Sequence, residues 1–116
     1  MTSMESFHSS WLCLFTEETW TTATSHNFCQ AAFSLAGKRA ALRIRNGDEL
    51  FAYITGRQRL AGILIARSMA QTAPSLSIFE HEGRFPVILQ SEPSIILSDD
   101  SWIPIERHIT NLRLFR

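Results

Sequence analysis

Arginine dominates the basic residues of this 116-residue chain, and the charge is unevenly distributed. Residues 38–67 contain seven basic and two acidic side chains, a net charge of +5, whereas residues 1–37 carry −3 and residues 68–116 carry −2. Arginine suits bidentate contacts with phosphates and stacking on flat rings. The segment therefore indicates an anion-binding face, with a solvated face of local ion pairs as the equally weighted alternative. The cationic candidates for such contacts are Lys38, Arg39, Arg43, Arg45, Arg57 and Arg59.

Residues that could do catalysis are few. The sequence contains no P-loop, no G-x-G-x-x-G, no G-x-S-x-G and no H-E-x-x-H. Glu80-His81-Glu82 could form an acid/base cluster, but neighbouring side chains of an extended segment alternate in direction, which favours a surface histidine. Cys13 and Cys29 lie in apolar settings without C-x-x-C spacing, which predicts reduced structural thiols. We therefore expect no enzyme activity, no metal site and no cofactor.

Residues 45–66 predict the hairpin around which the chain is organised. Asn46-Gly47-Asp48 forms a tight entry turn, Glu49–Thr55 is an alternating strand, and Leu60–Ala66 is an apolar partner strand. A strand that is apolar throughout is typical of a central position, buried on both faces. Gly62 within it would allow another backbone or a flat ligand to come close.

The segment before the hairpin predicts a strand and a helix. Residues 11–15 are a short apolar strand, and Thr16 is the expected N-cap of a helix over Glu17–Ser25 that ends at His26-Asn27. Trp20 is expected to pack this helix against the sheet. Residues 28–35 are ambiguous between a loop and a short helix, and residues 40–45 between a strand and a helical turn.

The second half predicts two more strands, over 85–91 and 94–97, separated by Pro93. Asp99-Asp100-Ser101 would cap a last helix or turn over 103–112. Together these elements indicate one α+β domain of five or six short strands with peripheral short helices, preceded by a flexible N-terminus at residues 1–9. No apolar run is long enough to span a bilayer and no signal peptide is evident, so we expect a cytoplasmic location without membrane contact.

The order of motifs from residue 10 onward resembles the EVE domain family and, more distantly, YTH domains, both within the PUA-like superfamily. Residues 10–20, SWLCLFTEETW, resemble the opening strand and Trp-containing helix, and residues 26–29 resemble the Asn-Val-Trp segment. Residues 45–53 resemble the basic-Pro-Gly-Asp turn and the strand that ends in Tyr. Residues 60–63 and 83–87 are similar to the returning strand and the aromatic-Pro strand.

The resemblance implies a small PUA-like/EVE-type β-barrel over residues 10–116 with a concave aromatic pocket for one modified base. YTH domains read methylated adenine in RNA, and EVE-like domains are associated with methylated or hydroxymethylated cytosine in DNA. The family implies a modified double-stranded DNA partner, base flipping, and the N-terminal position in a modification-dependent restriction protein with a C-terminal nuclease or GTPase domain. The pocket residues it indicates are Trp11, Phe28, Cys29, Phe33, Tyr53, His81 and Phe85.

This sequence departs from the family pattern at three positions. Cys29 stands where the family has a pocket Trp, so the wall would come from Phe28 or Phe33. His81 stands near the YTH aromatic, and Ile88 replaces an EVE arginine. An RNA-binding YTH/PUA-like module is the runner-up hypothesis. A protein-interaction or dimerisation domain is the alternative from another class, and a small nucleotide-acting enzyme is third. For the aromatic residues, core packing is the alternative to base binding.

Overall fold

The computed structural model describes residues 9–79, 85–104 and 113–114, the last two for their backbone only. Two α-helices lie in these ranges, α1 (Glu17–Ser25) and α2 (Lys38–Ala41), and no helix in them is long and apolar enough to cross a bilayer. The strands in the same ranges are β1 (Ser10–Phe15), β2 (Gln30–Phe33), β3 (Glu49–Ile54), β4 (Arg59–Ala66), β5 (Gln71–Thr72), β6 (Val87–Ile96), β7 (Ile103–Pro104) and β8 (Arg113–Leu114).

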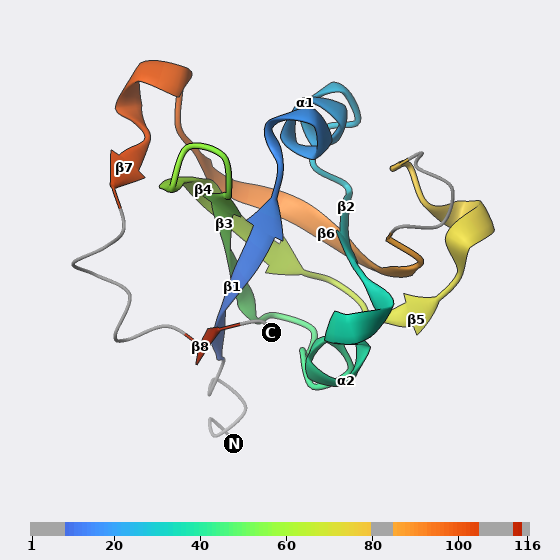
Figure 1. The fold of residues 1–116 in the computed structure, drawn as a ribbon. Coiled ribbons are helices and arrows are strands. Elements are labelled where there is room, and N and C mark those ends of the chain that lie inside the picture. The colour runs from blue at the N-terminus through green and yellow to red at the C-terminus, as the bar shows by residue number, and fades with distance from the viewer. Residues whose placement is uncertain (1–8, 80–84, 105–112, 115–116) are drawn as a thin grey trace.

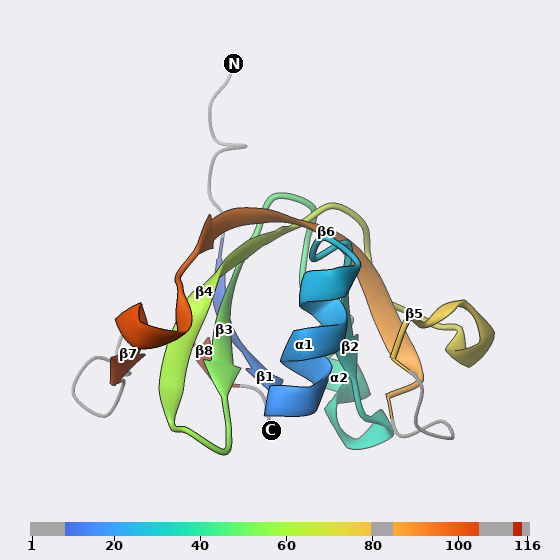
Figure 2. The same ribbon diagram turned by 90° about the horizontal axis from the view of Figure 1, so that it is seen from above.

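All eight strands belong to one strongly curled sheet. Its order is β2-β6-β4-β3-β1-β8, with β5 also paired to β6 and β7 to β4. Strand β1 runs parallel to β3 and β8, and the other pairs are antiparallel. The sheet arches over α1, which lies beside β2 (Figures 1 and 2). In the described residues β2 and β8 end the strand order without pairing to each other, so these residues show a curled half-barrel and not the closure of the β-barrel that the resemblance implied.

The predicted hairpin is confirmed as β3 and β4, and β4 is central because β3 and β6 flank it. Leu50, Ala52 and Ile54 of β3 are fully buried in the core, as the alternating pattern predicted. Gly62 does admit a close backbone: a Cβ atom there would lie 2.3 Å from the carbonyl oxygen of Ile95 in β6. The glycine therefore allows β6 to pack against β4 at this point.

The predicted helix is also confirmed, with the same bounds. The Thr16 hydroxyl accepts a hydrogen bond from the Thr19 N–H (3.0 Å), and the Thr19 hydroxyl accepts one from the Thr16 N–H (2.9 Å). This reciprocal capping box satisfies two otherwise unpaired donors at the helix start. Beyond the helix, Asn27 and Phe28 both adopt left-handed backbone angles, φ 59° and 58°. These two residues reverse the chain into β2.

Two predictions for the middle of the chain need correction, and one ambiguity is resolved. The segment after α1 that was ambiguous between a loop and a short helix contains β2, which pairs with the first half of β6. Residues 40–45 are the end of α2 and a turn, which is the helical one of the two alternatives. The predicted fourth and fifth strands are one ten-residue strand, β6. Pro93 does not interrupt it because the β4–β6 register shifts beside it, and a bulge tolerates a residue that lacks an N–H.

The predicted last helix is wrong in its first residues. Residues 99–101 form a 3₁₀ turn, and Ile103–Pro104 is strand β7, which pairs with Leu60 and Arg59 at the start of β4. A proline fits this two-residue edge strand as well as it would fit a helix start, so the sequence signal was not decisive. Residues 105–112 of that prediction lie outside the described residues.

Candidate functional site: an aromatic cluster around α1

Two hollows lie beside α1, and the first is small. It is a cavity of about 10 Å³ where β1, α1 and β2 meet, lined by Leu14, Phe15, Thr19, Ala32, Phe79 and Phe85. We call it the corner cavity. That volume is about one water molecule. The corner cavity would have to widen to accept a nucleobase.

The second hollow is a groove of about 440 Å³, within the size range of small-molecule binding sites. It lies between α1, the turn that joins β3 to β4, and the chain that follows β6. Its lining residues are Glu17, Trp20, Thr21, Thr24, Ser25, Phe28, Arg57, Ile96, Leu97, Asp99 and Trp102. We call it the α1 groove.

A row of aromatic rings lies between the two hollows. The ring centroids of Phe79 and Phe15 are 6.5 Å apart, those of Phe15 and Trp20 are 5.0 Å apart, and those of Trp20 and Phe28 are 5.0 Å apart. The first two pairs are edge-to-face and the third is tilted, arrangements that aromatic rings prefer. We call Phe15, Trp20, Phe28 and Phe79 the aromatic cluster. The prediction that Trp20 packs α1 against the sheet is confirmed by its contact with Phe15 of β1.

The backbone of Phe28 is held in place on both sides. Its N–H donates to the Ala23 carbonyl (2.7 Å), and its own carbonyl accepts from the Ser91 hydroxyl (2.8 Å). A left-handed conformation at a bulky residue costs free energy and persists only when the surroundings enforce it. These two hydrogen bonds supply that constraint and place the Phe28 ring against Trp20 at the α1 groove.

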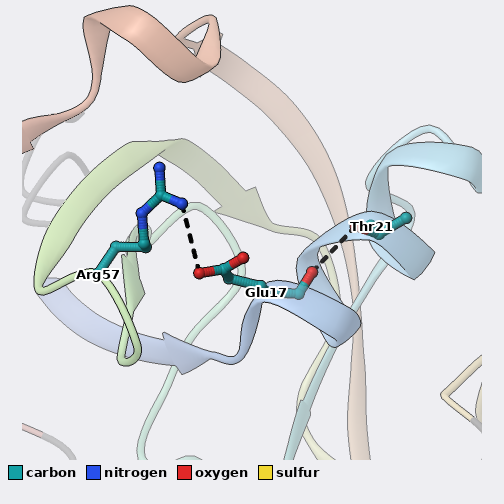
Figure 3. A network of polar contacts seen from close by, with 3 residues as sticks. All are labelled: Glu17, Thr21 and Arg57. Atoms are coloured by element: carbon teal, nitrogen blue, oxygen red, sulfur yellow. Dashed lines mark hydrogen bonds and ion pairs between the residues drawn. The ribbon is translucent and has the colours of Figure 1, made fainter.

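Arg57 and Glu17 form a polar rim on the groove. The Arg57 Nη1 and Glu17 Oε2 atoms are 3.5 Å apart, and the Arg57 guanidinium lies 5.6 Å from the Trp102 ring centroid. The Thr21 hydroxyl donates to the Glu17 backbone carbonyl (Figure 3). The Arg57 and Glu17 side chains are 50% and 56% exposed, and such ion pairs contribute only about 0–1 kcal/mol. A ligand could therefore open this pair at little cost.

The three tryptophan N–H groups differ in their partners. The Trp11 Nε1–H donates to Asp48 Oδ2 (2.9 Å), and the Trp102 Nε1–H donates to the Leu97 carbonyl (3.3 Å). Trp20 is only 6% exposed, yet its N–H finds no acceptor in the described part of the chain. A buried indole N–H normally has a partner, because an unmade hydrogen bond costs free energy. Among the described residues, the tryptophan N–H without an acceptor is therefore that of Trp20, which lines the α1 groove.

Asp48, which the sequence placed only in a turn, organises the opposite end of β1. Its side chain is buried and accepts three hydrogen bonds, from Ser9 N (3.0 Å), Trp11 Nε1 (2.9 Å) and Arg45 N (2.9 Å). Bonds to a charged acceptor are stronger than neutral ones. Parallel pairing places Trp11 opposite Leu50, two residues after Asp48. The Asn-Gly-Asp turn was the only sequence feature that pointed to Asp48, and it gave no indication of the contact with Trp11.

The predicted pocket residues do not share one cavity. Phe28 lines the α1 groove and Phe85 lines the corner cavity. Trp11 is bound to Asp48 in the core, at the other end of β1. Tyr53 lies on β3 beside the buried Ala52 and Ile54, so it is on the face of the sheet away from the core.

The remaining pocket candidates are dispersed as well. Phe33 is buried in β2, and Cys29, half-buried, directly precedes that strand. His81 lies outside the described residues. Their roles in base binding stay predictions, but of the candidates within the described ranges only Phe28 and Phe85 line a hollow that contacts the aromatic cluster.

The predicted cationic residues fall into two groups. Lys38 and Arg39 lie on α2, with Arg43 and Arg45 in the chain leading to β3. Arg57 and Arg59 lie beyond the far end of β3. Six strand residues at about 3.3 Å each separate the groups by roughly 20 Å. The basic segment is therefore continuous in sequence, but in space it occupies both ends of the hairpin.

Both cysteines are free thiols. Cys13 is fully buried in β1, and this desolvation raises the pKa of its thiol to about 12. A thiol in such surroundings stays neutral and inert, which agrees with the structural role predicted for it. No cluster of three or more metal-ligating side chains occurs among the residues that the structure describes.

Comparison with solved structures places the fold. The chain resembles Rpa0253 from Rhodopseudomonas palustris (17% identity, TM-score 0.58, covering 84% of this chain and 67% of that one). It also resembles the Pho92 YTH domain solved with m6A (15% identity, TM-score 0.61, covering 81% of this chain and 62% of that one). A third similar structure is the Zygosaccharomyces rouxii MRB1 YTH domain solved with N6-methyladenosine RNA (10% identity, TM-score 0.58, covering 78% of this chain and 61% of that one).

These likenesses show a YTH-like fold. The chain spans about two thirds or less of the length of each of these three structures. No family model matches the sequence, and no curated protein matches it.

Proposed function

We propose that this chain is a non-catalytic reader module that binds nucleic acid carrying a modified base. The observation that carries the proposal is the aromatic cluster, which offers ring faces and edges between two hollows in a YTH-like fold. Stacking on protein rings is worth roughly 1–3 kcal/mol per base, which offsets much of the cost of taking a base out of its stack.

RNA is the first polymer to test, because two similar structures were solved with N6-methyladenosine RNA or m6A. DNA with methylated or hydroxymethylated cytosine is the second candidate, favoured by the EVE-like order of motifs from residue 10 onward. An EVE-type setting, in which a nuclease or GTPase follows the reader in a restriction protein, is proposed on that resemblance alone.

Backbone contacts would come from the two cationic groups. Arg57 lines the α1 groove and Arg59 begins β4 two residues later. The α2 group lies about 20 Å away, so one bound strand would contact both groups only if it followed the hairpin. Each single-strand phosphate contact adds about 0.7 to the slope of log affinity against log salt. Replacing Arg43 by Gln should lower that slope by about this amount if the strand reaches α2.

The test is a panel of matched oligonucleotides measured by fluorescence anisotropy. It contains RNA with and without N6-methyladenosine, and DNA with cytosine, methylcytosine or hydroxymethylcytosine. We expect one modified oligonucleotide to bind at least about tenfold more tightly than its unmodified twin, with affinity that falls as salt rises. Absence of salt-dependent binding to every member would overturn the proposal and favour a protein-interaction domain.

A further inference from the structure

We propose that the α1 groove is a binding site for a single neutral nucleobase that carries an exocyclic amino group. This site is distinct from the corner cavity, and of the pocket residues that the resemblance indicates, Phe28 lines the groove and Phe85 lines the corner cavity. The two hollows share no lining residue, and the row from Phe15 to Trp20 separates them.

The shape and apolar floor of the groove suit a flat ring. Trp20, Phe28 and Trp102 are each less than 10% exposed, so they present edges or partial faces to the groove. The volume of about 440 Å³ is ample for a base with its sugar. Ile96, 39% exposed, supplies apolar contact at the end of β6.

The donors of the groove call for an acceptor on the ligand. The Trp20 N–H has no acceptor in the described residues although its side chain is buried. Within the described residues Arg57 uses one of its five N–H donors, on Glu17, and its guanidinium lies 5.6 Å from the Trp102 ring centroid. The turn that carries it is anchored, because the N–H groups of Arg57 and Gln58 both donate to the Ile54 carbonyl (3.1 and 2.8 Å). A ring nitrogen or carbonyl oxygen of a base would satisfy these donors.

The acceptors of the groove call for a donor on the ligand. Glu17 and Asp99 both line it, and an ionised carboxylate only accepts hydrogen bonds. An exocyclic amino group supplies two N–H donors in adenine, cytosine and guanine, one for each carboxylate, whereas a uracil base offers only its ring N3–H. With Arg57 as the single cation among the lining residues, the net charge of the groove is −1, which disfavours a phosphate inside it. The base is therefore the recognised part, and phosphates would remain outside.

The three tryptophans of the chain allow a direct test with free nucleosides. In ¹⁵N-labelled protein each indole N–H gives one NMR signal, and Trp20→Phe identifies the signal of Trp20. Titration with cytidine or adenosine should move the Trp20 signal and leave the Trp11 signal in place. Uridine should bind several-fold more weakly, as should the 5′-monophosphates.

Matched variants separate the groove from the rest of the surface. Arg57→Gln should weaken cytidine binding by roughly fivefold, and Trp20→Phe by up to roughly tenfold, because each removes a donor. Arg67→Gln is the control, since Arg67 pairs with Glu92 at a similar exposure and outside the groove. Should Trp20→Phe fail to fold, the exposed Arg57 variant still decides.

The proposal is overturned if no nucleoside moves the Trp20 signal, or if Arg57→Gln and Arg67→Gln bind cytidine equally well. It is also overturned if uridine binds as tightly as cytidine. Because the ligands are free nucleosides, these outcomes are independent of the oligonucleotide panel. Groove binding without any oligonucleotide binding would support this site and refute the reader function.

Discussion

Trp11 in β1 and Trp20 in α1 are both buried, but their indole N–H groups differ in hydrogen bonding. At the start of β1, the Trp11 N–H is buried against Asp48, which also holds the backbone N–H groups of Ser9 and Arg45. In the first half of α1, Trp20 is nearly as buried, but none of the described residues accepts a hydrogen bond from its N–H, which lies beside a groove of about 440 Å³. The difference teaches that burial alone does not distinguish a structural tryptophan from one that is available to a ligand. The hydrogen bonding of the indole N–H distinguishes them.

The largest effect should come from filling the space between β4 and β6. Gly62→Ala would push a Cβ to within 2.3 Å of the Ile95 carbonyl oxygen, in the centre of the sheet. We expect a loss of about 3 kcal/mol or more in the free energy of unfolding, measured in urea. Gly56→Ala is the matched control, because the nearest atom to its Cβ would be Glu17 Oε2 at 3.8 Å. Equal stability of the two variants would contradict the close β4–β6 approach.

The next largest loss in the free energy of unfolding should come from breaking the hydrogen bonds that Asp48 accepts from Trp11 and its neighbours. In Asp48→Asn one of the two accepting oxygens becomes an NH₂ group that faces N–H donors, so we expect a loss of about 2–3 kcal/mol in urea unfolding. Asp99→Asn, on an exposed carboxylate of the groove rim, should change stability by less than about 0.5 kcal/mol. If Asp48→Asn lowered stability by as little as Asp99→Asn, the hydrogen bonds of Asp48 would not stabilise the start of β1.

A third prediction uses pH to probe the core beneath β1. The pKa of the buried Cys13 thiol is about 12 in the folded chain against 9.0 for an ordinary thiol. Between these values the unfolded chain releases this proton and the folded chain keeps it, so the contribution to stability is complete below pH 9 and lost as pH rises toward 12. Wild type should lose about 1 kcal/mol per pH unit above pH 9 relative to Cys13→Ala. Parallel curves for the two proteins would show that Cys13 ionises freely.

The smallest effect on stability is expected at Trp20. Trp20→Phe keeps an aromatic ring and removes an N–H that has no acceptor in the described residues, so we expect a loss below about 1 kcal/mol in urea unfolding. Trp11→Phe leaves Asp48 short of a donor and should cost about 2 kcal/mol. A larger loss for Trp20→Phe than for Trp11→Phe would invert the comparison on which the groove assignment rests.

Local signals were enough to predict much of the frame. Thr16 marked the start of α1, and alternation along Glu49–Ile54 marked β3 and the residues that share each of its faces. Strand β2 was missed because four residues with two central alanines show no clear period. Strand β6 was divided at Pro93 because a proline ends most strands, and the register shift that accommodates it depends on β4.

The candidate site was harder to predict, because its parts meet only through the sheet. Trp20, Arg57 and Trp102 come from three distant segments, and no spacing in the sequence joins them. Charge counting identified the basic segment correctly but could not show that the hairpin carries Arg45 and Arg57 to opposite ends. Trp11 was a predicted pocket residue and Trp20 was predicted to pack the helix against the sheet, but only the hydrogen bonds show which indole N–H is already satisfied.

The most direct measurement of the central claim is the set of indole N–H signals during titration with the oligonucleotide that binds best. If a base enters the α1 groove, the Trp20 signal moves with a midpoint equal to the anisotropy Kd, and the Trp11 signal stays where it is. Tight binding that leaves the Trp20 signal unmoved would contradict the account and place the base elsewhere.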